Sequence, residues 1–294
     1  MTRARIEVVA GPTAAGKTGL AVRRAQQTGA VILSADAMQV YRGMDVGTAK
    51  ASLEERGGVR HFGLDVVDPW EPFDAAAFVA LGDAVIAEHE RVIVAGGTSL
   101  YVHALVRGLV QTPAVDPALR TELQDAPDLY DRLVRVDPAL AARLHPNDRV
   151  RLLRGVEVYL QTGERLSDLQ AAHAAQPDRY EVDGVWLDPP DLDRRIDTRA
   201  EGMFAGGLVE ETRRLLEAGV HRDLKPMRSL GYRHVCDHLL DGLPVEDALH
   251  RTQRDTRRFA RKQRTWGKVL RRWLWRADPG AETWGERPTA PPNA

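Results

Sequence analysis

The chain has little cysteine and no long apolar run, and each of these absences excludes a class of protein. Its single cysteine, Cys236, cannot form an internal disulfide or a cysteine-based zinc site. No apolar run approaches the roughly 18 residues that a membrane span requires, so we expect no membrane partner. Because the first expected strand begins at Ile6, we also expect no signal peptide, and a cytoplasmic location.

The chain as a whole lacks an excess of either charge, because its formal net charge is −1. The charges are nevertheless unevenly distributed along it. Residues 251–276 contain eleven Arg or Lys residues and one acid, Asp255, which gives this segment +10 and leaves −11 for the rest. A segment of this kind favours a polyanionic partner such as a nucleic acid.

The length and composition are those of an ordinary globular protein. With 294 residues, 43% hydrophobic and 28% charged, the chain can form one large domain or two smaller ones. It shows no internal repeat. We also find neither a metal-ligand spacing of His and Cys nor a nucleophile–base triad.

A glycine-rich loop near the start is the most informative pattern. The residues that match G-x-x-x-x-G-K-[ST] are Gly11, Pro12, Thr13, Ala14, Ala15, Gly16, Lys17 and Thr18. An apolar run suited to a buried strand (residues 6–10) precedes the loop, and a helical pattern (19–27) follows it. Backbone N–H groups and the positive end of a helix bind phosphate in such a loop. We expect Lys17 to neutralise a diphosphate or triphosphate, and Thr18 to hold Mg²⁺, the one cofactor expected.

Strand and helix patterns alternate through the first hundred residues, which predicts an α/β fold with a doubly wound parallel P-loop sheet. The expected strands are residues 6–10, 31–35, 62–67, 91–95 and 182–187. The expected core helices are residues 19–27, 75–88 and 192–218, the last with a break at Gly206 and Gly207. In such sheets ligands bind beyond the carboxyl ends of the strands, where the phosphate loop, Asp36 and residues 96–98 all lie.

Short helical patterns replace the strands after about residue 113. They are expected at residues 117–125, 129–136, 138–144 and 149–162. We therefore expect a P-loop core in residues 1–112 and 178–276, interrupted by an all-helical insertion in residues 113–177, and a monomer.

The basic segment falls in a last helix expected over residues 244–275. Its apolar-leaning stripe includes Trp266 and Trp273, which we expect to pack against the core rather than stack on bases. The Pro- and Gly-rich residues 277–294 are expected to be disordered.

Asp36 follows the second expected strand and is the strongest candidate for a general base. A carboxylate at that place would face an acceptor beside the bound phosphates and could take its proton. Gln39 could hold an acceptor adenine through a bidentate amide contact. The alternative is that Asp36 caps a helix or binds Mg²⁺ through water.

The strand that ends at Ala95 lacks the magnesium-binding aspartate of typical nucleotide hydrolases. Gly96, Gly97 and Thr98 follow it instead and would bring backbone and a hydroxyl to the phosphates. This favours a transferase with an acceptor pocket over an ATPase or GTPase.

Several arginines recur at helical spacing or flank a glycine. They are Arg151 with Arg154, Arg195 with Arg199, and Arg228 with Arg233. Each pair could form a solvated face or bind a phosphodiester backbone. Arg195 or Arg199 could instead stabilise a departing diphosphate.

Taken in order, these motifs resemble the bacterial tRNA dimethylallyltransferase (tRNA isopentenyltransferase) family. Besides the phosphate loop, the matching segments are residues 34–41, 44–50, 96–101, 145–148, 154–159, 162–163, 231–233, 261–263 and 265–266. The resemblance implies transfer of a dimethylallyl group from dimethylallyl diphosphate to N6 of the adenine 3′-adjacent to the anticodon. It also implies Mg²⁺ and a helical insertion that grips the anticodon stem-loop of tRNA.

The resemblance implies roles for individual residues. Asp36 would be the catalytic base. From the chemistry of the reaction we further expect Lys17, Thr98 and Arg199 to stabilise the leaving diphosphate and Arg195 to help to bind it. Contacts to tRNA would come from Asp36, Ala37, Met38, Gln39, Thr98, Arg120, Val150, Arg151, Leu152, Leu153, Arg154, Arg228, Ser229, Leu230, Gly231, Tyr232 and Arg233. Two residues depart from the family pattern, Ala37 and Ala15, where Ser is frequent; neither change removes a charged catalytic group.

Three other functions stay open on the residues alone. A P-loop kinase of a small molecule would explain the loop and Asp36 but not the basic segment or the insertion. An enzyme that prenylates free adenine nucleotides would need neither of those two features. A non-catalytic RNA-binding protein could keep the loop as a relic, although intact Lys17, Thr18 and Asp36 argue against it.

Overall fold

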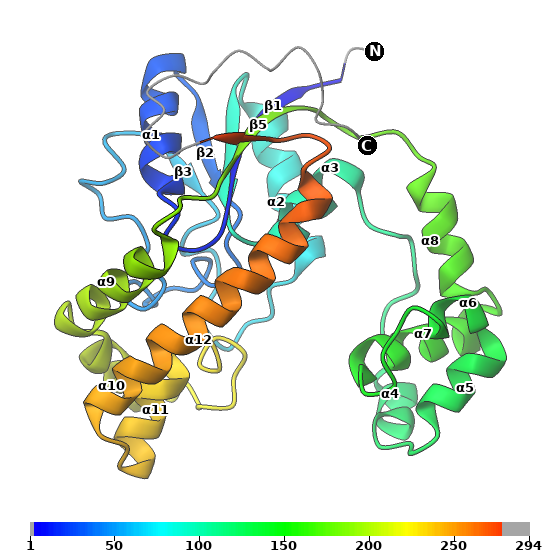
Figure 1. The fold of residues 1–294 in the computed structure, drawn as a ribbon. Coiled ribbons are helices and arrows are strands. Elements are labelled where there is room, and N and C mark those ends of the chain that lie inside the picture. Colours follow the sequence, from blue (N-terminus) through cyan, green and yellow to red (C-terminus); the bar gives the residue numbers. More distant parts are fainter. Residues whose placement is uncertain (1–2, 278–294) are drawn as a thin grey trace. The chain divides into compact units, whose positions relative to one another are not determined.

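The computed structural model describes residues 3–277 (Figure 1). The chain forms two compact units: Arg107–Asp178 is one, and the chain on either side of it forms the other. The sequence placed this division at residues 113 and 177. No helix in the described part of the chain is long and apolar enough to cross a membrane.

The core unit contains a six-stranded sheet. Its strands are β1 (Arg5–Ala10), β2 (Val31–Ser34), β3 (His61–Phe62), β4 (Val92–Gly96), β5 (Glu181–Leu187) and β6 (Trp275–Ala277). They lie in the order β3-β2-β4-β1-β5-β6, and every pair is parallel. The expected doubly wound parallel fold is therefore confirmed. Because the chain passes from one side of β1 to the other, a ligand crevice is expected at the carboxyl ends of β1 and β4.

Helices cover both faces of this sheet (Figure 1). The helices of the core unit are α1 (Lys17–Thr28), α2 (Ala75–Glu88), α3 (Ser99–Arg107), α9 (Leu192–Ala205), α10 (Leu208–Glu217), α11 (Tyr232–Asp241) and α12 (Val245–Trp266). Of these, α10 and α11 pack against α9, α12 and each other rather than on the sheet (Figure 1). One apolar cluster joins α1 and α9 to the sheet, and another includes residues of α2, α3, α10 and α11. Burial on both faces explains why the strands are continuous apolar runs rather than alternating ones.

The unit Arg107–Asp178 is all-helical, as expected. Its helices are α4 (Pro117–Gln124), α5 (Leu129–Val136), α6 (Pro138–Ala141), α7 (Arg149–Thr162) and α8 (Leu166–Ala174). They share a core that includes Leu129, Leu133 and Leu152. The buried Asp137 carboxylate accepts hydrogen bonds from the N–H groups of Leu140 (3.0 Å) and Ser167 (2.8 Å), which fixes the starts of α6 and α8.

Two expected elements are wrong in extent. The strand expected at residues 62–67 ends at Phe62, because Gly63 (φ 77°) and Asp65 (φ 55°) turn the chain. The last helix ends at Trp266 instead of residue 275; a 3₁₀ turn follows at Gly267–Leu270, and β6 then joins the sheet. The helix pattern did not indicate α3, α8 or α11. Of the tail expected to be disordered, residue 277 closes β6, and residues 278–294 lie outside the described residues.

The two tryptophans of the basic segment differ in burial. Trp273 is 8% exposed and packs in the core as expected. Trp266 is 51% exposed, so the expectation that it packs in the core is wrong. The break expected at Gly206 and Gly207 is confirmed, since it separates α9 from α10.

Candidate active site

The glycine-rich loop connects β1 to α1 as its sequence predicts. Gly11 lies so close to β5 that a Cβ there would stand 2.5 Å from the carbonyl oxygen of Leu187. Gly16 (φ 88°) precedes α1, which begins at Lys17 without a side-chain cap. The N–H groups of the first helical turn are therefore available to an anion. The Lys17 ammonium folds back over the loop and donates to the Pro12 carbonyl (2.7 Å).

Two cations and one carboxylate meet beside this loop. Burial, together with the positive charge of Arg199, lowers the pKa of Lys17 to about 8, and Asp36 opposes that shift. Burial also lowers the pKa of Arg199, opposed by the charges of Asp36 and Glu55. Arg199 donates weakly to the Thr48 carbonyl (3.4 Å), and its buried Nε has no partner among the described residues. The cluster is therefore cationic and suited to a ligand with several negative charges.

Asp36 lies in the turn that follows β2. Its Oδ1 accepts from the N–H groups of Met38 (2.8 Å) and Gln39 (3.4 Å), whereas its Oδ2 accepts no hydrogen bond from any described residue. The capping alternative therefore accounts for only one of the two oxygens. The second oxygen is available to a proton donor on a substrate.

Thr98 fastens this turn to the end of β4. Its hydroxyl accepts from the Ala37 N–H (3.1 Å), and its own N–H donates to the Ala35 carbonyl (3.1 Å). The approach is close enough that a Cβ on Gly96 would lie 2.1 Å from the Ala35 oxygen. Glycine at this place allows the two loops to touch, and Thr98 then fixes the orientation of the Asp36 turn.

Gln39 does not present a free amide edge. Its Oε1 accepts from the Ser34 hydroxyl (3.0 Å), and its Nε2 donates to the carbonyls of Thr48 (3.2 Å) and Ala49 (3.3 Å). The expected bidentate contact with an adenine stays a prediction, and it would require the amide to exchange these partners. The amide instead holds the loop of residues 41–50 against the end of β2.

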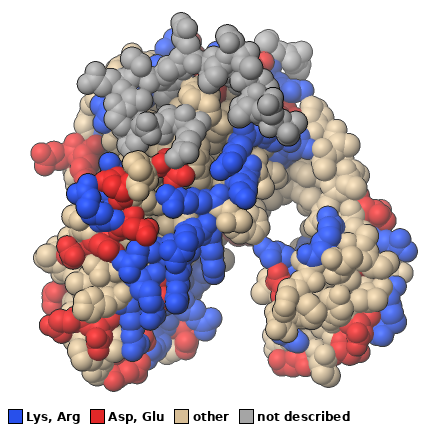
Figure 2. Space-filling model, viewed as in Figure 1, with Lys and Arg blue, Asp and Glu red and all other residues tan. Residues whose placement is uncertain are grey.

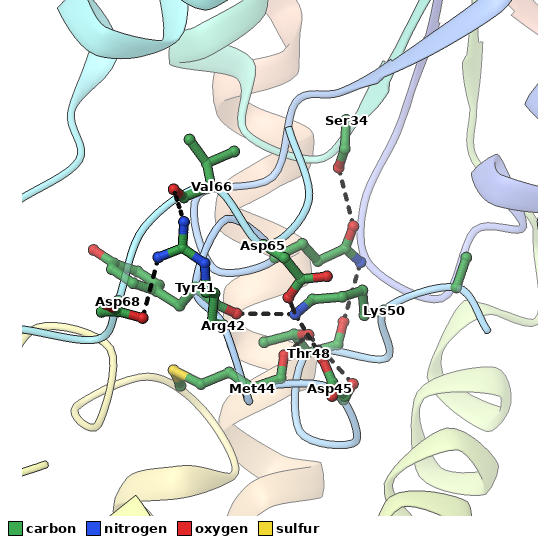
Figure 3. A network of polar contacts seen from close by, with 12 residues as sticks. Ser34, Tyr41, Arg42, Met44, Asp45, Thr48, Lys50, Asp65, Val66 and Asp68 are labelled. Carbon is green, nitrogen blue, oxygen red and sulfur yellow. Dashed lines mark hydrogen bonds and ion pairs between the residues drawn. The ribbon is translucent and has the colours of Figure 1, made fainter. Parts of the chain in front are cut away.

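A buried lysine that the sequence did not single out organises the same loop (Figure 3). The Lys50 side chain is 3% exposed. Its ammonium donates to the Tyr41 carbonyl (2.9 Å) and to carboxylates of Asp45 and Asp65 (2.6 Å each). Because two carboxylates compensate the buried charge, Lys50 serves as a fixed centre for the loop.

Glu211, on α10, is a second buried charge that the sequence did not indicate. Its carboxylate accepts from the N–H groups of Asp45 (2.9 Å), Val46 (2.8 Å) and Gly47 (3.0 Å), and from the Tyr232 hydroxyl (2.5 Å). Tyr232 is fully buried, and its pKa is strongly raised by burial and by Glu211. The side chain expected to contact tRNA is therefore part of the core.

The remaining residues expected near tRNA in the core unit lie around the start of α11, whereas Arg195, expected to help to bind the diphosphate, lies on α9. Arg228 and Arg233 are both exposed; Arg228 faces Asp223 (3.5 Å), and Arg233 pairs with Asp255 (2.5 Å). Ser229 and Leu230 are partly buried, and Gly231 is buried. Arg195 pairs with Asp191 (2.7 Å), so Arg199, not Arg195, is the arginine that acts on Lys17.

In the helical unit the expected tRNA residues divide into exposed and structural ones. Val150 and Arg151 are exposed at the start of α7, and Arg151 pairs with Asp148. The Leu152 side chain is 1% exposed, and Leu153 packs against the same apolar core.

Two arginines of this unit have structural partners. Arg120 binds both carboxylate oxygens of the buried Glu157 (2.6 and 2.7 Å). Arg154 donates to the Thr112 hydroxyl (2.6 Å) and the Pro113 carbonyl (2.7 Å). Exposure therefore favours Val150 and Arg151 for contact with a partner.

The basic helix α12 presents a band of positive charge (Figure 2). Part of it is compensated, because Arg257 pairs with Asp197 and Arg264 with Asp188. Four exposed cations form no ion pair within the described residues: Arg261, Lys262, Lys268 and Arg271. Arg261 and Lys262 lie on α12, whereas Lys268 and Arg271 lie in the turns directly after it. We call these four residues together the free cations of α12.

We call the phosphate loop, residues 11–18, the cradle. It has one feature that suits Mg²⁺. Thr18 is exposed, and its hydroxyl forms no hydrogen bond with the residues that the structure describes. Among those same residues, no cluster of three or more His, Cys, Asp or Glu could hold a metal ion. A Mg²⁺ ion here would therefore depend on Thr18 and on oxygens of a bound phosphate, a ligation that this ion accepts.

The fold and the site together define a P-loop protein built for group transfer from a diphosphate. An IPP transferase family model matches residues 39–270, and an isopentenyl transferase model matches residues 4–68. The tRNA dimethylallyltransferase of Anaeromyxobacter dehalogenans (strain 2CP-C) is 48% identical over 287 residues, 94% of this chain and 95% of that protein. The tRNA dimethylallyltransferase 1 of Citrifermentans bemidjiense is 44% identical and covers 94% and 93%. The chain belongs to the tRNA dimethylallyltransferase family of prenyltransferases.

Solved structures agree with this assignment. The full-length tRNA isopentenylpyrophosphate transferase of Bacillus halodurans aligns with a TM-score of 0.68 and 32% identity, covering 94% of this chain and 90% of that one. A eukaryotic dimethylallyltransferase acting on tRNA aligns with a TM-score of 0.81 and 25% identity, covering 94% and 74%.

Proposed function

We propose that this chain transfers the dimethylallyl group of dimethylallyl diphosphate to N6 of the adenine 3′-adjacent to the anticodon in tRNA. The products are N6-dimethylallyladenosine and diphosphate. The observation that carries the proposal is the meeting of Lys17, Arg199 and Asp36 at one edge of the sheet. Two cations suit a diphosphate, and the partner-free Oδ2 of the carboxylate suits an amine that must lose a proton.

Adenine N6 is a poor nucleophile because its lone pair is delocalised into the ring. The enzyme must therefore both stabilise the leaving diphosphate and remove the N6 proton. As N6 forms its bond to C1 of the dimethylallyl group, the C1–O bond breaks and the diphosphate leaves with the electron pair. Lys17 and Arg199 stabilise the negative charge that accumulates on it. The N6 proton passes to Oδ2 of Asp36, whose orientation Thr98 fixes through Ala37. When bound at Thr18, Mg²⁺ would supply further neutralisation of the diphosphate.

The acceptor is presented on a loop of tRNA. A loop nucleotide can leave its stack at a cost of about a few kcal/mol, and RNA loops are where base-specific recognition is easiest. We assign phosphate contacts to the free cations of α12 and to Arg228, and contacts with the anticodon stem-loop to Val150 and Arg151. We also propose that the protein acts as a monomer, in the cytoplasm with its tRNA substrate.

The test supplies the purified protein and Mg²⁺ with dimethylallyl diphosphate or ATP, and with unmodified tRNA or AMP, followed by mass analysis of nucleosides. Prenylated adenosine should form only from dimethylallyl diphosphate with tRNA. Phosphorylated product from ATP would support a kinase instead, and prenylated AMP would support an enzyme of free nucleotides. Binding of tRNA without any product would leave only an RNA-binding protein.

A further inference from the structure

Gln263 connects the loops that follow β1 and β4. It lies near the end of α12 and is 8% exposed. Its Oε1 accepts from the Thr13 N–H (2.9 Å), and its Nε2 donates to the Gly97 carbonyl (3.0 Å). One side chain therefore holds the phosphate loop and the end of β4 at a fixed spacing.

The surroundings of this bridge are specific to an amide. A Cβ on Gly97 would lie 2.6 Å from Nε2 of Gln263 and 3.6 Å from the Lys17 ammonium, so the bridge stands directly beside the cradle. An amide offers an acceptor and a donor together, without charge. A carboxylate could accept from Thr13 but could not donate to Gly97, and its charge would oppose an incoming diphosphate.

The same turn of α12 also faces solvent. Arg261 and Lys262 immediately precede Gln263, are exposed, and belong to the free cations of α12. Successive helical residues point in different directions, so this turn presents cations outward while it inserts an amide into the core. A polyanion seated on the cations would restrain the segment that carries Gln263.

We propose that Gln263 is a positioning residue that couples RNA binding on α12 to prenyl diphosphate binding in the cradle; this rests on the proposed function. RNA phosphates on Arg261 and Lys262 steady the end of the helix, and Gln263 then holds Thr13 and Gly97 in the arrangement that receives the diphosphate. Linkage requires the effect to be mutual, so each ligand raises the affinity for the other by the same factor.

The experiment measures equilibrium binding of an unreactive thiolodiphosphate analogue of dimethylallyl diphosphate, with and without a tRNA transcript. In the unmodified protein, tRNA should tighten analogue binding by about fivefold or more. Gln263→Met removes the donor and the acceptor, and should weaken analogue binding about tenfold, abolish the coupling and leave the affinity for tRNA alone within about twofold. Gln253→Met makes the same change ten residues earlier on α12. It should leave the affinity for the analogue, the affinity for tRNA and the coupling between them unchanged.

A pH series separates positioning from simple loss of packing. In the Gln263→Glu variant a protonated carboxyl can again accept from Thr13 and donate to Gly97, so analogue affinity should recover as the pH falls, while Gln263→Met stays weak at every pH. The proposal is overturned if Gln263→Met binds the analogue as tightly as the unmodified protein. It is equally overturned if that variant loses both ligands to the same extent. Should the unmodified protein fail to bind the analogue, the proposed function is wrong and this inference falls with it.

Discussion

The hydroxyl of Tyr232 donates to the carboxylate of Glu211 over 2.5 Å, and both side chains are buried. The same carboxylate holds three consecutive N–H groups of residues 45–47, so one charge organises two segments that match the family, residues 44–50 and 231–233. These hydrogen bonds join α10, α11 and the loop after β2, and both side chains are buried away from the surface. This arrangement predicts an effect on stability first and on activity only as a consequence.

We expect Glu211→Gln to destabilise the fold more than Tyr232→Phe. The amide would turn an NH₂ group toward donors that now bind a carboxylate, whereas loss of the hydroxyl removes one charge-assisted hydrogen bond worth about 1.5–3 kcal/mol. Denaturant unfolding measures both changes. Glu210→Gln is the matched control, because Glu210 is exposed in an ion pair with Arg213 and its replacement should leave the stability nearly unchanged. Equal stabilities of the Glu211 and Glu210 variants would contradict the role of the buried carboxylate.

Asp36→Asn should reduce turnover by about 100-fold or more with little change in tRNA affinity. The asparagine oxygen can still accept from Met38 and Gln39, so the turn survives while the base is lost. Single-turnover rates and tRNA binding, measured on the same preparation, test this. Near-normal turnover would remove Asp36 as the base.

The low pKa of Lys17 predicts that prenyl diphosphate binding weakens as the pH rises above about 8. The ammonium of the ligand-free protein loses its charge there, so the affinity should fall by up to about tenfold per pH unit. Titrations of the unreactive analogue at a series of pH values measure this affinity. Lys17→Met is the control, because it should bind the analogue weakly and with no such dependence on pH. A flat profile in the unmodified protein would contradict it.

The stability of the ligand-free protein should change with the opposite sign. Between about 8 and the ordinary value of 10.5, the unfolded chain retains the Lys17 proton that the folded chain has lost. Because the unfolded state then binds more protons, this group adds stability as the pH rises, and Lys17→Met should remove that increment. Unfolding free energies of the two proteins across this range provide the comparison.

Arg120→Ala should act chiefly by destabilising the helical unit. It leaves the buried Glu157 carboxylate with only the more distant Arg154 guanidinium (3.6 Å), at an expected cost of about 3 kcal/mol. The double change Arg120→Leu with Glu157→Leu should recover much of the stability. Unchanged unfolding combined with weaker tRNA binding would instead show that Arg120 meets RNA directly.

Replacing the free cations of α12 with Gln should weaken tRNA binding and reduce its salt dependence. If all four meet phosphates, the slope of log affinity against log salt should change by about three. Arg257→Gln with Arg264→Gln is the control, because those arginines already pair with Asp197 and Asp188 and should leave the slope unchanged. An unchanged slope in the fourfold variant would show that these four cations do not contact the RNA backbone.

The parts of the molecule that local sequence determines were predictable. The phosphate loop, α2 and α7 follow from glycine placement, capping and apolar spacing, and the structure has α2 and α7 at the expected residues. Elements whose ends depend on contacts with distant parts of the chain were not predictable. The last helix stops where Gly267 meets Trp186, since a Cβ there would lie 2.0 Å from the indole ring.

The site shows the same distinction. Asp36 and Lys17 stand next to recognisable loops, so residue type and position indicated them. Glu211 and Gln263 bind backbone groups more than 160 residues away. Gln263 lies in a segment that matches the family, but the local sequence of neither residue indicates these partners. The sequence also did not indicate that the Tyr232 side chain is buried, because its partner lies on another helix.

A structure of the protein with the unreactive analogue and an anticodon stem-loop tests the central claim most directly. We predict the diphosphate in the loop Gly11 to Thr18, adenine N6 within hydrogen-bond distance of Asp36 Oδ2, and the hydrocarbon carbon C1 facing N6. A hydrocarbon chain directed away from Asp36, or an adenine bound elsewhere, would contradict the account.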